Sequence, residues 1–219
     1  MPELPEVETI RRDLSDKITG KEINEIKISK DSALKKSQEN FSSFITEKNF
    51  SKIDRRGKLL IFDVSNSNHH VLSHMRMTGK LIYQPPQEEV EEFPTKHTGI
   101  IFYFADDSEL YFDDIRTFGY MHLVDSTQKE NILEEKLGIE PLQDNFTLKN
   151  FEDVLENRTT DIKSILLKQR AIAGIGNIYA DEICFESKVK PDKKIPKLNQ
   201  KQIKSIWKNC EVVLKEAID

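Results

Sequence analysis

The 219-residue sequence predicts an α+β fold, in which an N-terminal antiparallel β-sandwich is followed by a helical domain. Short runs rich in β-branched and aromatic residues occupy about 22–124, and turn-forming clusters separate them. No helical segment interrupts these runs, which favours antiparallel pairing in a sandwich or barrel. The remainder of the chain has apolar residues at helical spacing, and a short helix is expected before the first strand.

The N-terminal helix is expected over 5–14. Pro5 suits the start of a helix, because its missing N–H has no partner to lose there. Val7, Ile10 and Leu14 recur at helical spacing and predict one buried stripe.

The strands are expected in apolar runs at 58–64, 70–77, 80–83, 99–105, 109–112 and 119–124. The segment 84–96 is rich in glutamate and proline, so it is expected to form an exposed acidic loop. Polar composition around 126–147 marks a domain boundary, and we place the two domains at 1–128 and 129–219.

The second domain is expected to contain at least three helices. One follows candidate caps at 159–161, and a second covers 178–185 after a turn with two glycines. A third begins at Asn199, since Gln202 three residues later completes a capping box.

Composition excludes several classes of protein. No stretch approaches about 18 consecutive apolar residues, so no transmembrane helix is expected. The acidic N-terminus is not a secretory signal. Cys184 and Cys210 form neither a disulfide framework nor a CxxC zinc pair, so we expect both to be core thiols. Such sparse cysteine use favours the reducing cytoplasm. Four histidines without metal-ligand spacing are expected to be structural, namely His69, His70, His74 and His122. For His74 the alternative is a supporting role behind the residues of the site.

The charge is distributed unevenly along the chain. The net charge of −5 and the pI near 5.7 argue against a nucleic-acid partner. However, residues 158–208 hold twelve Lys/Arg against five Asp/Glu, whereas residues 86–114 hold one Lys against nine Asp/Glu. The basic window fits either a solvated helical face or a local phosphate-binding surface.

The segment Met1-Pro2-Glu3 is the first candidate for chemistry. Removal of Met1 leaves a secondary amine on Pro2, and an α-amino pKa of about 7.7–8.0 leaves part of it unprotonated near neutral pH. Such an amine can attack an electrophilic carbon and form an iminium. Glu3 and Glu6 could then supply general acid and base. Alternatively, Pro2 is a processed terminus and the glutamates only stabilise the helix.

Two further segments are candidates for binding. In 171–182, Gly174 and Gly176 permit a turn that presents backbone N–H groups to an anion near Asn177. The alternative is an ordinary helix corner with glycine caps. In 113–120, a loop carries Arg116 and Phe118, which are suitable groups for filling a gap in a base stack. The alternative places Phe118 in the core and Arg116 on the surface.

Six motifs occur together in a characteristic order: MPELPEVETIRR, RRGKLLIF, HMRMTGKL, KHTG, DIRTFG and AGIGNIYADE. On these motifs the sequence resembles, along essentially its whole length, the bacterial formamidopyrimidine-DNA glycosylases, which are 8-oxoguanine DNA glycosylases and AP lyases. The resemblance implies an N-terminal β-sandwich, a helix–two-turn–helix module and base-excision repair of damaged double-stranded DNA. We expect a monomer without a membrane partner.

The resemblance also implies catalytic roles. Pro2 would be the nucleophile that attacks the sugar C1′. Glu3 would donate a proton for base loss and ring opening, with Glu6 in support. Lys58 would be the second acid/base group, for β-elimination.

Roles in DNA binding follow from the same resemblance. Met77, Arg116 and Phe118 would fill the void left by the flipped base, and Arg116 would face the orphaned cytosine. Phosphate contacts are implied for His97, Arg158, Lys163 and the backbone at Gly176 and Asn177.

The sequence departs from the family pattern at its C-terminus. Family members continue into a zinc finger with two CxxC pairs, whereas this sequence stops at Asp219. We therefore expect no zinc site and no other cofactor in this chain. Two alternatives remain. One is a truncated, weakly active or non-catalytic DNA-binding paralogue. The other is an RNA- or ribosome-binding protein that shares only the helical module, but it leaves the N-terminal motif unexplained.

Overall fold

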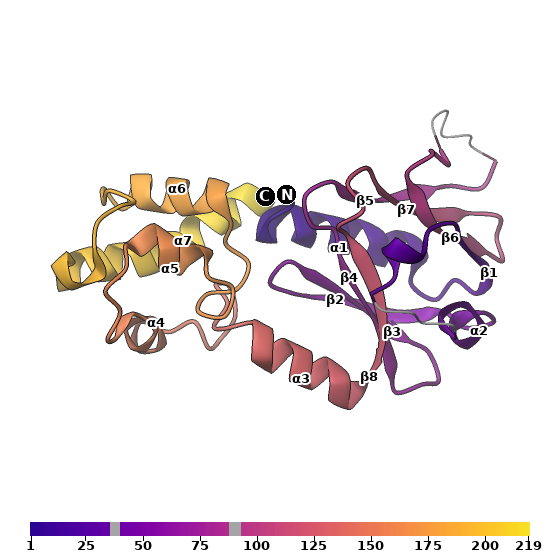
Figure 1. Ribbon diagram of the computed structural model, residues 1–219, viewed down its shortest axis with the longest axis horizontal. Helices are drawn as coiled ribbons and strands as arrows, with labels where there is room; N and C mark the ends of the chain where they lie inside the picture. Colours follow the sequence, from indigo (N-terminus) through magenta and orange to yellow (C-terminus); the bar gives the residue numbers. More distant parts are fainter. Residues whose placement is uncertain (36–39, 88–92) are drawn as a thin grey trace. The chain divides into compact units, whose positions relative to one another are not determined.

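A computed structural model describes residues 1–35, 40–87 and 93–219 (Figure 1). The chain forms two compact units, and two short N-terminal segments, Glu3–Glu8 and Arg56–Lys58, group with helical residues far along the sequence. The sandwich unit comprises Met1–Pro2, Thr9–Arg55 and Leu59–Glu130, and the helical unit comprises Glu3–Glu8, Arg56–Lys58 and Asn131–Asp219.

The sandwich unit contains two four-stranded sheets. The first has the order β1-β6-β7-β5, made of β1 (Ile23–Ile28), β6 (Thr98–Phe104), β7 (Glu109–Asp114) and β5 (Gly79–Gln84). The second has the order β2-β3-β4-β8, made of β2 (Phe50–Arg56), β3 (Leu59–Val64), β4 (His69–His74) and β8 (Tyr120–Asp125). The pairs β1–β6, β6–β7, β5–β7, β3–β4 and β4–β8 are antiparallel. The expected strands and their antiparallel arrangement are confirmed.

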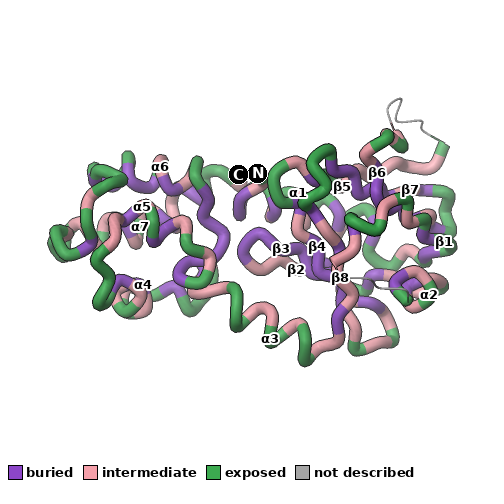
Figure 2. Tube along the Cα trace, viewed as in Figure 1, coloured by how far each residue is buried: buried purple, intermediate pink, exposed green. Residues whose placement is uncertain are grey.

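Aromatic rings fill the core of this unit. The Phe50 ring lies 5.0 Å from that of Phe62 in its own sheet and 5.8 Å from that of Phe102 in the other sheet. Phe41, on the short helix α2 (Phe41–Ile45), also meets Phe102 edge-on. Figure 2 shows buried residues along the strands of both sheets. Contacts between rings of the two sheets are those of a sandwich with a shared apolar interior.

Several elements of this unit lie outside the expected runs, namely strands β1 and β2 and helix α2. The 3-10 helix η1 (Asp31–Ala33) was not expected, and a Cβ on Gly99 would lie 2.6 Å from the Ala33 Cβ. The absence of a side chain at Gly99 therefore lets η1 approach strand β6. The predicted acidic loop 84–96 includes residues 88–92, which lie outside the described part of the chain.

Helix α1 spans Leu4–Ile18, so it is longer than the expected 5–14. Val7 and Leu14 of the predicted stripe are buried, and Ile18 extends that stripe by another turn. Ile10 is only partly buried. Leu4 packs in the apolar core of the helical unit. The N-terminus of α1 is thus held by packing that local periodicity does not reveal.

The helical part of the chain holds α3 (Ser126–Lys136), α4 (Leu148–Leu155), α5 (Ile162–Leu167), α6 (Asn177–Glu186), the 3-10 helix η2 (Ile195–Lys197) and α7 (Gln200–Ile218). Asp161 caps α5 by accepting from the Ser164 N–H, and Asn199 with Gln202 forms the expected capping box of α7. Helix α3 was not expected, because it buries no residue fully and so lacks a clear apolar stripe.

Cys184 and Cys210 are both buried in the core of the helical unit, as expected. Burial raises the pKa of the Cys184 thiol to about 11. Within the described residues, no helix combines the length and apolar character needed to cross a membrane.

Candidate active site and nucleic-acid interface

Glu3 lies at the N-terminus of α6. Its side chain is only 3 % exposed, and its carboxylate accepts hydrogen bonds from the backbone N–H groups of Gly176 (2.6 Å), Ile178 (3.0 Å) and Tyr179 (3.4 Å). Amide groups in the first turn of a helix have no partner within the helix, and the helix dipole favours an anion there. The carboxylate next to Pro2 in the sequence is therefore fixed in one place.

Two glycines allow this approach. A Cβ on Gly176 would lie 2.2 Å from the Glu3 Cδ, so any larger residue would displace the carboxylate. Gly174 has a φ of +95°, and its carbonyl accepts from the Leu4 N–H at 3.0 Å. The turn does bind an anion, as its sequence indicates, and that anion is the chain's own Glu3.

This arrangement concerns the two backbone positions implied for phosphate binding. The Gly176 N–H donates to the Glu3 carboxylate at 2.6 Å. Asn177, the first residue of α6, is exposed. Both phosphate contacts stay predictions, and Asn177 is the more accessible of the two positions.

Glu6 links Glu3 to α6. One oxygen of its carboxylate accepts from the Glu3 N–H at 2.8 Å, and the other accepts from the Tyr179 hydroxyl at 2.6 Å. Burial, followed by the hydrogen bond to Glu6, raises the pKa of Tyr179. Sequence reasoning did not single out Tyr179. The sequence signal that could have identified Tyr179 is its position in the first turn of the helix that follows the two-glycine turn.

Lys58 belongs to the same unit and is 5 % exposed. Burial lowers its pKa from the ordinary 10.5, although the charges of Glu3 and Glu6 oppose that shift. A lowered pKa gives the amine a larger unprotonated fraction at neutral pH, which a proton acceptor requires. We refer to Glu3, Glu6, Lys58 and Tyr179 as the glutamate cluster.

A buried carboxylate holds the turn that carries Lys58. Glu140 is fully buried and accepts from the Arg56 guanidinium and, at 2.7 Å, from the Gly57 N–H. The Arg56 guanidinium also donates to the Gly138 carbonyl at 2.5 Å. Sequence reasoning missed Glu140. Its only signal is an isolated acid between apolar residues and a proline.

Met77, Arg116 and Phe118 meet on the surface of the sandwich unit. Met77 is 49 % exposed and Phe118 is 57 % exposed. The Arg116 guanidinium donates to the Met77 sulfur at 3.4 Å and lies 5.3 Å from the centre of the Phe118 ring. We call these three residues the wedge group. The alternative with Phe118 in the core is wrong, because the ring is exposed.

Asp114 fixes the backbone beneath the wedge group. Its carboxylate accepts from the Gly119 N–H at 2.6 Å, the Arg116 N–H at 3.1 Å and the Thr78 hydroxyl at 2.5 Å. Burial works to raise the pKa of Asp114, but these hydrogen bonds outweigh it and the pKa falls below its ordinary value. The exposed side chains of the wedge group therefore project from a loop whose backbone is held by hydrogen bonds. Asp114 was not identified from the sequence.

The other expected phosphate contacts differ in their surroundings. Arg158 is exposed just after α4, and His97 is partly buried just before β6. Lys163 forms an ion pair with Asp181, at 2.7 Å between Nζ and Oδ1. Its charge is thus partly neutralised within the protein.

Within the described ranges, no group of three or more His, Cys, Asp or Glu side chains is placed to hold a metal ion.

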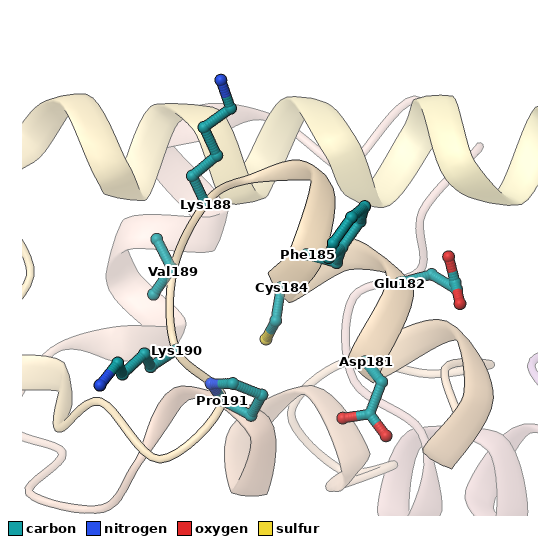
Figure 3. A pocket seen from close by; sticks show the side chains of 8 residues that line it. All are labelled: Asp181, Glu182, Cys184, Phe185, Lys188, Val189, Lys190 and Pro191. Atoms are coloured by element: carbon teal, nitrogen blue, oxygen red, sulfur yellow. The ribbon is translucent and has the colours of Figure 1, made fainter.

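One hollow of the helical unit contains none of the expected catalytic residues. It has a volume of about 720 Å³ and is lined by Asp181, Glu182, Cys184, Phe185, Lys188, Val189, Lys190 and Pro191 (Figure 3). Phe185, at its rim, is 76 % exposed. The raised pKa of Cys184 keeps its thiol protonated and unreactive near neutral pH. We therefore base the candidate active site on the glutamate cluster rather than on this hollow.

Comparison with known proteins finds two family models that match successive parts of the chain. Residues 1–121 match the family model described as the formamidopyrimidine-DNA glycosylase N-terminal domain, and residues 137–219 match that of the formamidopyrimidine-DNA glycosylase H2TH domain. A formamidopyrimidine-DNA glycosylase of Listeria monocytogenes is 40 % identical over 220 residues, covering 100 % of this chain and 78 % of the relative. That of Ligilactobacillus salivarius is 40 % identical over 210 residues, covering 95 % and 74 %.

Solved structures agree in fold over nearly the whole chain. The Lactococcus lactis formamidopyrimidine-DNA glycosylase, bound non-covalently to DNA with an AP site, has a TM-score of 0.90 at 34 % identity and covers 99 % of this chain and 81 % of that one. A complex of the inhibited Lactococcus enzyme with DNA containing N7-benzyl-Fapy-dG also has a TM-score of 0.90 at 34 % identity, covering 99 % and 79 %. By its matched domains and by its identity to relatives over its full length, the chain belongs to the formamidopyrimidine-DNA glycosylase family.

Proposed function

We propose that this chain removes oxidised purines, such as 8-oxoguanine and formamidopyrimidines, from double-stranded DNA and cleaves the resulting abasic site through a Schiff base on Pro2. The observation that carries the proposal is the fixed Glu3 carboxylate, bound by three amides at the start of α6. It directly follows Pro2 in the sequence and shares a unit with a buried lysine of lowered pKa. The proposal implies a cytoplasmic activity, because its proposed substrate is chromosomal DNA.

The proposed chemistry begins at the N-terminal amine. After removal of Met1, the Pro2 nitrogen attacks C1′, the glycosidic bond breaks, and the base leaves with a proton. The nitrogen gives up its own proton, and the ring oxygen O4′ accepts one as the C1′–O4′ bond opens, which leaves an iminium. Glu3, with Glu6 in support, carries protons in these steps. Lys58 removes a C2′ proton, so that the 3′ phosphate departs in β-elimination.

The wedge group supports the step before chemistry. A stacked base must be extruded at a cost of a few kcal/mol before C1′ can be attacked. Met77 and Phe118 fill the space that the base leaves, and Arg116 faces the orphaned base. His97, Arg158, Lys163 and Asn177 contact phosphates, which fix the register without reading sequence. The order of the wedge loop, held by Asp114, supports this role.

We further propose that the chemistry uses only groups of the protein and no metal or other cofactor. Structural zinc sites use about four Cys or His ligands, whereas this chain has two cysteines, Cys184 on α6 and Cys210 on α7, which are buried free thiols. Metal analysis of the purified 219-residue chain tests this, and stoichiometric zinc would contradict it.

Borohydride trapping tests the proposed nucleophile. Reduction should join the processed N-terminus covalently to duplex DNA with an abasic site. Pro2→Gly should weaken trapping strongly, and an N-terminal tag that blocks the amine should abolish it. Equal trapping by the tagged protein would falsify the assignment, and no trapping by the untagged chain would favour a non-catalytic DNA-binding protein.

A further inference from the structure

Tyr179 contacts both glutamates of the cluster. Its hydroxyl donates to one oxygen of Glu6 at 2.6 Å, and its backbone N–H donates to Glu3 at 3.4 Å. Tyr179 therefore connects the start of α6 to both acidic residues of the N-terminal motif. None of the roles proposed above uses its hydroxyl.

The second oxygen of Glu6 continues this connection to the main chain. It accepts from the Glu3 N–H at 2.8 Å. That N–H belongs to the peptide group between Pro2 and Glu3, which is planar and also contains the Pro2 Cα. A hydrogen bond that orients the Glu3 N–H therefore orients the peptide group to which the proline ring is attached.

The Tyr179 hydroxyl holds the Glu6 carboxylate in the position from which it orients the peptide group between Pro2 and Glu3. Glu6 is on the exposed side of α1 and is not packed in an apolar core, so its carboxylate needs hydrogen bonds to stay in one rotamer. Its two oxygens bind the Tyr179 hydroxyl and the Glu3 N–H. A hydrogen bond to a charged carboxylate is among the stronger ones in proteins.

We propose that Tyr179 is a positioning residue, which acts through Glu6 to orient the peptide that carries the Pro2 nucleophile. The inference rests on the proposed function, since it concerns the orientation of the same Pro2 amine. Tyr179 has no direct part in bond making. Its removal should slow iminium formation and leave the binding of abasic DNA unchanged.

Tyr179→Phe tests this with a small change, because the ring and its packing remain and only the hydroxyl is lost. The single-turnover rate of borohydride trapping on abasic duplex should fall about tenfold, whereas the Kd for that duplex should not change. Tyr111→Phe is the matched control. The Tyr111 hydroxyl also donates to a carboxylate, Glu109, at 2.6 Å, but this pair lies in the sandwich unit on β7. Trapping by this control should match the wild type.

A double-mutant cycle separates positioning from a structural role. Glu6→Gln alone should also slow trapping, and Tyr179→Phe should add little in the Glu6→Gln background if Tyr179 acts through Glu6. Independent, multiplicative losses would overturn the inference, as would an unchanged trapping rate in Tyr179→Phe. If the wild type itself forms no adduct, the proposed function fails. If the wild type forms one and Tyr179→Phe forms it equally fast, only this inference fails.

Discussion

The glutamate cluster and the wedge group share one structural feature, a carboxylate that accepts hydrogen bonds from several backbone N–H groups. In the cluster this carboxylate is Glu3, to which the proposed function assigns proton transfer and which is 3 % exposed. In the wedge it is Asp114, which only orders the loop and leaves Phe118 57 % exposed. A proton donor or acceptor works best in one fixed geometry, whereas a residue proposed to enter DNA must begin at the surface. The same anchoring therefore fits the two different roles that we propose for these regions.

The two regions should fail in different ways when mutated. Losses in the glutamate cluster should reduce the chemical steps on every DNA substrate, since abasic DNA also needs them. Losses in the wedge group should appear only where a base has to be unstacked. The following predictions test this contrast, from the largest expected effect to the smallest.

Lys58→Arg should have the largest effect, a loss of about a hundredfold in β-elimination. Arginine keeps the positive charge but does not lose its proton in a protein. In the wild type, the elimination rate should rise with pH as Lys58 loses its proton, with a midpoint below 10.5 because burial lowers that pKa. Rates of strand cleavage at a preformed abasic site, measured across pH, provide the test. A variant with the wild-type rate would show that Lys58 is not the base.

Phe118→Ala should have a smaller and selective effect. Activity on duplex containing 8-oxoguanine should fall about tenfold, because extrusion costs a few kcal/mol and the ring no longer offsets part of it. Cleavage of a single-stranded abasic substrate should be unchanged, since no base pair is opened. Parallel single-turnover assays on both substrates measure the difference. Equal losses on the two would remove Phe118 from the wedge.

Arg158→Ala and Lys163→Ala should have the smallest effects, and unequal ones. A lost phosphate contact lowers the slope of log K against log salt by about one unit. Arg158→Ala should approach this value. Lys163→Ala should change the slope less, because its ammonium group is already paired with Asp181. Binding isotherms on undamaged duplex at several salt concentrations test the ranking. A larger change for Lys163 would mean that DNA displaces Asp181.

Much of the secondary structure follows from local patterns in the sequence. The expected strands, the capping box at Asn199 and the buried cysteines are all present in the structure. Periodicity and capping depend on residues a few positions apart, so they can be read without the fold. Helix α3 was not predicted, because it lacks the apolar stripe on which a periodicity argument depends.

The motifs indicated the candidate residues, and the tertiary structure decided how they are held. Glu3 and Gly176 are 173 positions apart, yet Gly176 must be glycine because the Glu3 carboxylate occupies the place of its Cβ. Glu140 reaches the turn before Lys58 across more than 80 positions. Hydrogen bonds to buried carboxylates depend on which backbone amides lack partners after folding. No local pattern contains that information, so Glu140, Asp114 and Tyr179 could be identified only from the tertiary structure.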